Sequence, residues 1–218
     1  MSEQLRIVFM GTPDFAVATL KNIVASNYKV VGVITAPDKP AGRGRKLQQS
    51  AVKKYAEENN LNVLQPTNLK DPNFLEELKA LDANLQVVVA FRMLPEVVWS
   101  MPTHGTFNLH ASLLPDYRGA APINWALING ETKTGVTTFF IDEKIDTGAV
   151  ILQKEIPIEA DENAGALHDK LMNLGADLVT ETLKNIAEST VTTKLQLQTT
   201  DLKTAYKLNK DNTKIDWN

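Results

Sequence analysis

Cysteine is absent from the 218-residue sequence, histidine occurs only three times, and aromatic residues make up 6% of the chain. Without cysteine there can be no disulfide, no thiolate nucleophile and no cysteine-ligated zinc site. His104, His110 and His168 are scattered and share no helical spacing that would gather them around one ion. We therefore expect no metal in the working protein.

Long hydrophobic runs are missing as well. No apolar stretch approaches the roughly 20 residues that cross a bilayer, and the run from Leu5 to Met10 is too short for a secretory signal. The net charge of −3 gives no overall sign of a nucleic-acid binder, although a local basic patch is compatible with it. We expect a cytoplasmic protein with a substantial core and no membrane association.

The sequence does contain an alternation of strand-like and helix-like segments. Apolar runs typical of buried strands occur at 5–10, 29–35, 61–64, 85–90 and 106–110, with helical patterns between them, and the first helix should have Thr12 as N-cap and Pro13 at its first position. The runs at 134–141 and 149–156 predict an antiparallel pair. Together they predict an α/β fold: a Rossmann-like, open, mostly parallel twisted sheet with helices on both faces.

The chain divides into two parts by composition. A long amphipathic helix with leucines at 167, 171, 174 and 178 completes a predicted domain over 1–189, whereas 190–218 is polar and weakly patterned and reads as a linker. In open α/β sheets ligands bind beyond the carboxyl ends of the strands. The loops that follow the strands therefore predict one active-site edge.

One such loop follows Phe107-Asn108-Leu109-His110, where an amide and an imidazole stand two residues apart. Side chains at i and i+2 of a strand share a face, so Asn108 and His110 should point the same way and Leu109 the other. A hydrogen-bond donor beside a group that titrates near neutrality suits acyl-type chemistry. A lone histidine is more often structural, and we assign His104 and His168 to structural or surface roles.

Asp146 is the candidate third member of this site. It lies in a tight Asp-Thr-Gly loop, where an aspartate commonly forms a local Asx-turn, but its carboxylate could instead orient His110. We expect the nearby Asp142 and Glu143 to be solvated. Arg118, before a Gly-Ala-Ala-Pro turn and an expected helix, is equally consistent with anion binding and with a local carboxylate partner.

A basic Pro/Gly-rich loop over 37–46 contains Lys39, Arg43, Arg45 and Lys46. Charge runs are usually solvated surface, but a flexible basic loop at the carboxyl edge of a sheet in an acidic protein favours a polyanionic partner. It lacks the Ser or Thr that follows the lysine of a P-loop, and Gly11-Thr12-Pro13 lacks two glycines of a dinucleotide fingerprint. A nucleotide-dependent oxidoreductase is therefore disfavoured.

Five motifs resemble the methionyl-tRNA formyltransferases: MGTPDFA (10–16), TAPDKPAGRGRKL (35–47), NLHASLLPDYRGAAPINWALINGE (108–131), TGVTTFFIDEKIDTG (134–148) and KIDW (214–217). The resemblance implies catalysis by Asn108, His110 and Asp146, with 10-formyltetrahydrofolate as formyl donor. It also implies that initiator methionyl-tRNA is the partner, that Lys39, Arg43, Arg45 and Lys46 meet its acceptor arm, and that the enzyme is a monomer. A C-terminal β-barrel domain of the family, expected after 190–218, is absent from this chain.

The resemblance further implies a set of folate-contacting residues. These are Ser112, Leu113, Leu114 and Pro115 in one wall, and Arg92, Met93, Leu94, Ile141, Asp142 and Glu143 around the pterin ring. The alternatives are a sugar-nucleotide formyltransferase or a formyltetrahydrofolate hydrolase, both disfavoured by the basic loop, and a non-catalytic folate- or RNA-binding module. Convergence of Asn108, His110 and Asp146 on one cavity would argue against the last.

Overall fold

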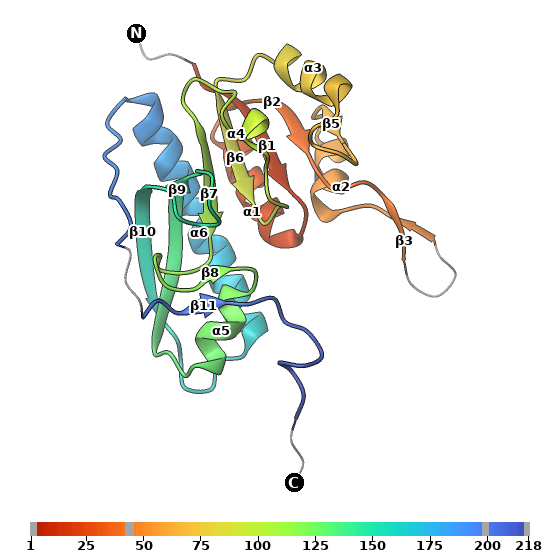
Figure 1. Ribbon diagram of the computed structural model, residues 1–218. Helices are drawn as coiled ribbons and strands as arrows, with labels where there is room; N and C mark the ends of the chain where they lie inside the picture. The colour runs from red at the N-terminus through yellow and green to blue at the C-terminus, as the bar shows by residue number, and fades with distance from the viewer. Residues whose placement is uncertain (1–3, 42–45, 198–200, 216–218) are drawn as a thin grey trace.

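The computed structural model describes residues 4–41, 46–197 and 201–215. Its centre is a seven-stranded sheet in the order β10-β9-β7-β6-β1-β2-β5 (Figure 1). The five strands at one side run parallel: β1 (Arg6–Gly11), β2 (Lys29–Ile34), β5 (Val63–Leu64), β6 (Leu85–Val89) and β7 (Thr106–His110). β9 (Lys133–Phe140) pairs antiparallel with β7, and β10 (Val150–Pro157) pairs antiparallel with β9. The predicted fold class is confirmed.

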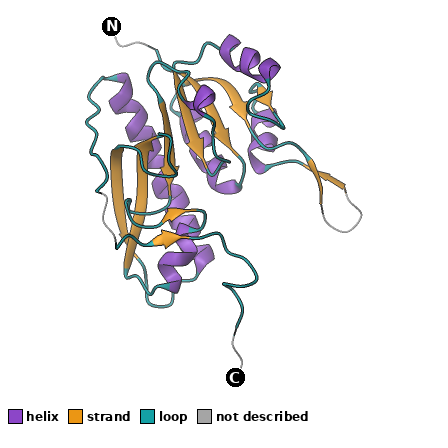
Figure 2. Cartoon of the chain, viewed as in Figure 1, coloured by secondary structure: helices purple, strands orange, loops and turns teal. Residues whose placement is uncertain are grey.

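Helices cover both faces of this sheet (Figure 2). The larger core cluster lies beneath α1 (Asp14–Ala25), α2 (Ala51–Glu58) and α6 (Ala164–Ala187), with α5 (Pro122–Ile128) packed against it. The smaller cluster lies beneath α3 (Pro72–Ala80) and α4 (Glu96–Trp99). Strand side chains alternate between the two clusters: Ile7 and Phe9 join the first, Val8 and Met10 the second. Burial on both faces explains the continuous apolar runs of the parallel strands.

The start of α1 differs from the prediction. Pro13, with extended backbone, occupies the N-cap position and the helix begins at Asp14, so Thr12 is not the N-cap. Pro13 provides no side-chain cap, and its carbonyl accepts the Ala16 N–H at 2.9 Å. Asp14 places a carboxylate in the first turn, where it complements the helix dipole.

Two small sheets lie outside the main one. β3 (Lys39–Ala41) and β4 (Lys46–Gln48) form an antiparallel hairpin within the predicted basic loop, and it projects away from the body of the domain (Figure 1). β8 (Arg118–Gly119) pairs in parallel with β11 (Thr204–Ala205). Ala205 is buried, so the polar segment after α6 packs onto the domain at this point. The helices in the described part of the chain include none long and apolar enough to span a membrane.

Candidate active site

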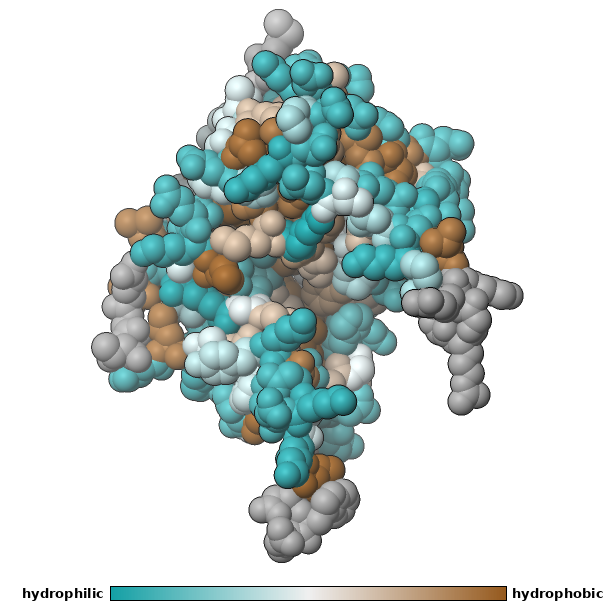
Figure 3. All heavy atoms as spheres, turned by 45° about the vertical axis from the view of Figure 1, so that its right-hand side comes forward, coloured by the Kyte–Doolittle hydropathy of each residue, from teal (hydrophilic) through white to brown (hydrophobic). Residues whose placement is uncertain are grey.

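A cavity of about 660 Å³ opens where β1, β6 and β7 end, at the edge of the sheet predicted to bind ligands. The face shown in Figure 3 is hollowed near its centre, with apolar residues inside the hollow and polar residues around it. Asn108, His110 and Asp146 all line the cavity. The structure therefore brings together the three residues that the sequence analysis assigned to catalysis, one of them from a loop 36 residues further along the chain.

The alternation of β7 places the two polar groups of this strand. Asn108, Leu109 and His110 are all lining residues, and the Leu109 side chain packs on α6, where a β-carbon on Gly175 would lie 2.7 Å from its Cδ2 atom. Asn108 is partly exposed, whereas His110 is 7% exposed. Strand geometry thus supplies an amide and a mostly buried imidazole to the same wall.

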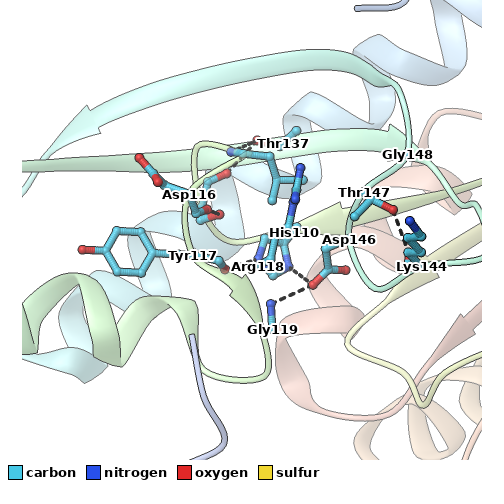
Figure 4. A network of polar contacts seen from close by, with 12 residues as sticks. His110, Asp116, Tyr117, Arg118, Gly119, Thr137, Lys144, Asp146, Thr147 and Gly148 are labelled. Atoms are coloured by element: carbon cyan, nitrogen blue, oxygen red, sulfur yellow. Dashed lines mark hydrogen bonds and ion pairs between the residues drawn. The ribbon is translucent and has the colours of Figure 1, made fainter. Parts of the chain in front are cut away.

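Both ring nitrogens of His110 face oxygen atoms (Figure 4). Nε2 lies 2.8 Å from the Tyr117 carbonyl oxygen, and Nδ1 lies 3.8 Å from Oδ2 of Asp146. A carbonyl oxygen only accepts, so Nε2 must be the nitrogen that carries the proton in the neutral ring. In the neutral ring Nδ1 then carries the lone pair, and it is the nitrogen that faces Asp146.

Asp146 is held in place by a backbone donor. The Gly119 N–H donates to Oδ2 at 2.9 Å, and both Asp146 and Tyr117 adopt left-handed backbone conformations, with φ of 55° and 60°. Non-glycine residues rarely take such angles, and when they do they cluster at functional sites. The Asx-turn considered for Asp146 is formed instead by Asp142, which accepts from the Lys144 N–H at 3.1 Å and from the Thr147 hydroxyl at 2.7 Å.

The cavity lining includes most of the residues expected around a pterin ring: Arg92, Met93, Leu94, Ile141 and Asp142. Glu143 is not one of the described residues that line the cavity. The Arg92 guanidinium donates to the carbonyls of Pro66 and Thr67, the latter at 2.9 Å, and burial lowers the pKa of this guanidinium from its ordinary value. Arg92 therefore binds the neighbouring loop with its guanidinium and is at the same time a lining residue of the cavity.

The segment from Ser112 to Pro115 lies beside the cavity instead of forming its described wall. The Ser112 hydroxyl donates to the Asp116 carbonyl at 2.7 Å, and the Leu114 N–H donates to the Thr137 hydroxyl at 3.2 Å. Ser112 and Leu114 are also buried. These contacts make the segment a support for the loop that follows β7, and a role for Ser112, Leu113, Leu114 and Pro115 in folate contact stays a prediction.

Several site features were not foreseen in the sequence. His168, assigned to a structural or surface role, lines the cavity and packs edge-on against Phe15 with ring centres 5.3 Å apart. The Tyr117 carbonyl and the Gly119 N–H are backbone atoms, for which side-chain patterns give no signal. The Arg118 guanidinium donates to the amide oxygen of Gln196 at 3.1 and 2.6 Å, and no carboxylate among the described residues pairs with it; anion binding by Arg118 stays a prediction.

The basic hairpin is anchored at its root. Lys53 Nζ lies 2.6 Å from Oδ2 of Asp38, and the Gln65 amide donates to Oδ1 at 2.8 Å. These bonds lower the pKa of the Asp38 carboxyl from its ordinary value, the Lys53 bond contributing most. Lys39 is exposed on β3 and Lys46 lies in β4, while Arg43 and Arg45 fall outside the described residues.

A doubly wound sheet with an Asn–His–Asp constellation at its carboxyl edge is the arrangement of an acyl-type transferase. The profile of the family described as "Formyl transferase" matches residues 5–183, and the chain belongs to this family. A methionyl-tRNA formyltransferase of Flavobacterium johnsoniae is 72% identical over 215 residues, which cover 99% of this chain and 68% of that protein. A methionyl-tRNA formyltransferase of Bacteroides thetaiotaomicron is 59% identical over 219 residues, with the same coverage. The resemblance seen in the motifs is confirmed.

Solved structures share the fold at lower identity. An N-formyltransferase from Helicobacter canadensis, in complex with folinic acid and dTDP-3-aminofucose, superposes with a TM-score of 0.74 at 23% identity over 98% of this chain and 75% of that chain. Glycinamide ribonucleotide transformylase 1 from Symbiobacterium toebii superposes with a TM-score of 0.73 at 17% identity, over 89% of this chain and 95% of that chain. Both likenesses concern the fold.

Proposed function

We propose that the protein transfers the formyl group of 10-formyltetrahydrofolate to the free amino group of methionyl-initiator tRNA, for translation initiation. The observation that carries the proposal is the convergence of Asn108, His110 and Asp146 on one cavity, with Nδ1 of His110 beside the carboxylate. This convergence disfavours a non-catalytic binding module. The identity of 72% to a methionyl-tRNA formyltransferase over almost the whole chain supports the choice of reaction within the family.

The folate is assigned to the apolar residues of the cavity wall. Met93, Leu94 and Ile141 offer an apolar surface for a flat pterin ring, and backbone groups around Asp142 offer polar contacts at its rim. The fold neighbour from Helicobacter canadensis was solved with folinic acid, which supports a folate-derived donor in this fold. The formyl group on N10 would then lie near Asn108 and His110, which line the same cavity.

The chemical step begins when the methionyl amine attacks the formyl carbon. A new C–N bond forms and the carbonyl oxygen becomes an oxyanion, which the Asn108 amide stabilises by donating a hydrogen bond. A donor of this kind is worth about 2.7–4 kcal/mol in the barrier. Charged His110, with a proton on Nδ1, adds a second donor, and the negative charge of Asp146 at 3.8 Å stabilises that charged form.

The tetrahedral intermediate collapses when the bond between the formyl carbon and N10 breaks. One proton must leave the attacking amine and one must reach N10, so the proton count balances if a single group transfers it. Charged His110 can do so by giving its Nδ1 proton to N10 as the bond breaks and then taking a proton from the amine, while Nε2 stays bonded to the Tyr117 carbonyl. The products are formylmethionyl-tRNA and tetrahydrofolate.

The tRNA is assigned to the open side of the cavity and to the basic hairpin. Lys39, Arg43, Arg45 and Lys46 are the proposed phosphate contacts, and the bonds of Asp38 fix the direction in which the hairpin leaves the domain. We further propose that the enzyme acts as a monomer in the cytoplasm, where charged tRNA is available.

An acceptor assay tests the proposal. Purified full-length protein is given formyl-labelled 10-formyltetrahydrofolate and one of three acceptors: methionyl-initiator tRNA, a nucleotide-linked amino sugar, or water. The proposal predicts label in formylmethionyl-tRNA. Preferential label in the sugar would favour a sugar-nucleotide formyltransferase, and release of formate at the same rate without an amine acceptor would favour a hydrolase.

A further inference from the structure

The segment after α6 returns across the loops that support the catalytic pair. Lys194 pairs with Val150 through two backbone hydrogen bonds, of 2.8 and 2.9 Å, and thereby fixes the position of Gln196 two residues later. Further on, the Tyr117 N–H donates to the Lys203 carbonyl at 2.6 Å, and β11 pairs with β8. Figure 1 shows this segment running beside β8 and α5. It therefore contacts the supports of both His110 and Asp146.

Gln196 has a fully used side chain. Its amide nitrogen donates to the carbonyls of Asp146 and Gly148, at 3.0 and 2.8 Å, and its amide oxygen accepts two bonds from the Arg118 guanidinium. An amide has two N–H donors, so both are engaged here. The amide orientation is thus fixed by partners on two different loops.

The carbonyls that Gln196 binds belong to the loop that presents the catalytic carboxylate. Asp146 has a left-handed backbone conformation, which persists only where neighbouring contacts hold it. Its Oδ2 atom accepts the Gly119 N–H at 2.9 Å and lies 3.8 Å from Nδ1 of His110. Gly119 follows Arg118 directly. Gln196 therefore binds both the segment that provides the Gly119 N–H and the loop that provides the Asp146 carboxylate.

We propose that Gln196 is a positioning residue, which holds the Asp146 carboxylate at the distance from His110 at which its charge stabilises the charged imidazole. It contacts no substrate in this scheme and acts only through the backbone of residues 146–148 and through Arg118. The inference rests on the proposed formyl transfer, and it gives the segment after α6 a role in catalysis.

The test compares three single variants of the full-length protein. Gln196→Ala removes all four bonds, whereas Gln196→Glu keeps an acceptor for Arg118 but leaves the two carbonyls without a donor. Both should lower kcat about 10-fold, which corresponds to about 1.4 kcal/mol, with each KM changed less than about 2-fold. Leu195→Ala, at an 82% exposed neighbour, is the matched control and should retain wild-type kinetics.

A double-variant cycle separates positioning from general destabilisation. In an Asp146→Asn background, Gln196→Ala should change kcat by less than about 2-fold, because the carboxylate that it positions is no longer charged. Wild-type kcat in both Gln196 variants, or an equal loss in the Asp146→Asn background, would overturn the proposal.

Amide hydrogen exchange supplies a readout that needs no turnover. The Gly119 N–H, bonded to Asp146 in the wild-type protein, should exchange faster in Gln196→Ala and at the wild-type rate in Leu195→Ala. Unchanged exchange would contradict the positioning role even in a protein with altered kinetics. A wild-type protein that forms no formylmethionyl-tRNA would instead overturn the proposed function, while the exchange rates would still decide the role of Gln196.

Discussion

Replacing Asp146 by asparagine preserves the size of the side chain and removes its charge. The amide oxygen can still accept the Gly119 N–H, so the loop should keep its conformation. What is lost is the attraction between the carboxylate and the charged form of His110. The Asp146→Asn variant therefore isolates the electrostatic part of the proposed mechanism.

The geometry sets the size of the effect. Opposite charges about 4 Å apart attract by about 4 kcal/mol at the effective dielectric constant of 20 that suits partly buried pairs. The observed separation is 3.8 Å, and the two side chains are 8% and 15% exposed. Since His110 is charged during only part of the reaction, we expect kcat to fall by about 100- to 1,000-fold, or about 2.7–4 kcal/mol.

The assay is single-turnover formylation of methionyl-tRNA at saturating folate and tRNA, which reports the chemical step and not product release. Thermal unfolding of the same preparation serves as the control for folding. A rate within about 5-fold of wild type would refute the electrostatic role of Asp146, because it would leave most of the predicted attraction without effect on the barrier.

Three further predictions concern stability and tRNA binding. Hydrogen bonds from Lys203, and secondarily from Tyr117, lower the pKa of Glu131, so their contribution to stability should be complete above the ordinary value of 4.5 and lost as pH falls through the lower folded value. Urea unfolding of Glu131→Gln should therefore show a smaller loss of stability in acid than the wild-type protein. Identical pH profiles of the two proteins would argue against this. Gly148→Ala should destabilise the fold by about 1–3 kcal/mol in urea unfolding, because its β-carbon would lie 1.7 Å from the Phe140 carbonyl oxygen; an unchanged midpoint would contradict this. Arg43→Ala should raise KM for tRNA, weaken its salt dependence and leave KM for folate unchanged; an effect on folate alone would refute phosphate contact.

Local patterns in the sequence predicted the sheet and one wall of the site. Continuous apolar runs such as 85–90 indicate strands buried on both faces, and the structure has β6 there with both faces covered. Because side chains alternate between the two faces of a strand, Asn108 and His110 were predicted to lie on the same face. The rule that ligands bind at the carboxyl ends of parallel strands located the cavity.

Contacts between distant segments could not be predicted in this way. Gln196 lies 50 residues after Asp146, in a polar stretch without periodicity, and its contacts depend on how the chain returns after α6. Backbone partners such as the Tyr117 carbonyl have no side-chain signature. The position of Asp146 beside His110 required the tertiary fold, because the tight loop was also compatible with a local turn, which Asp142 in fact forms.

The most direct test of the central claim is the rate at which the full-length protein and its His110→Ala variant transfer labelled formyl from 10-formyltetrahydrofolate to methionyl-initiator tRNA. The imidazole is the proposed oxyanion donor and proton carrier, so its removal should lower kcat by at least about 100-fold while folate binding, measured by fluorescence titration, is retained. Formylation by the wild-type protein with this loss in the variant is the predicted result. Equal rates in the two proteins, or no formylmethionyl-tRNA from the wild type, would contradict the account.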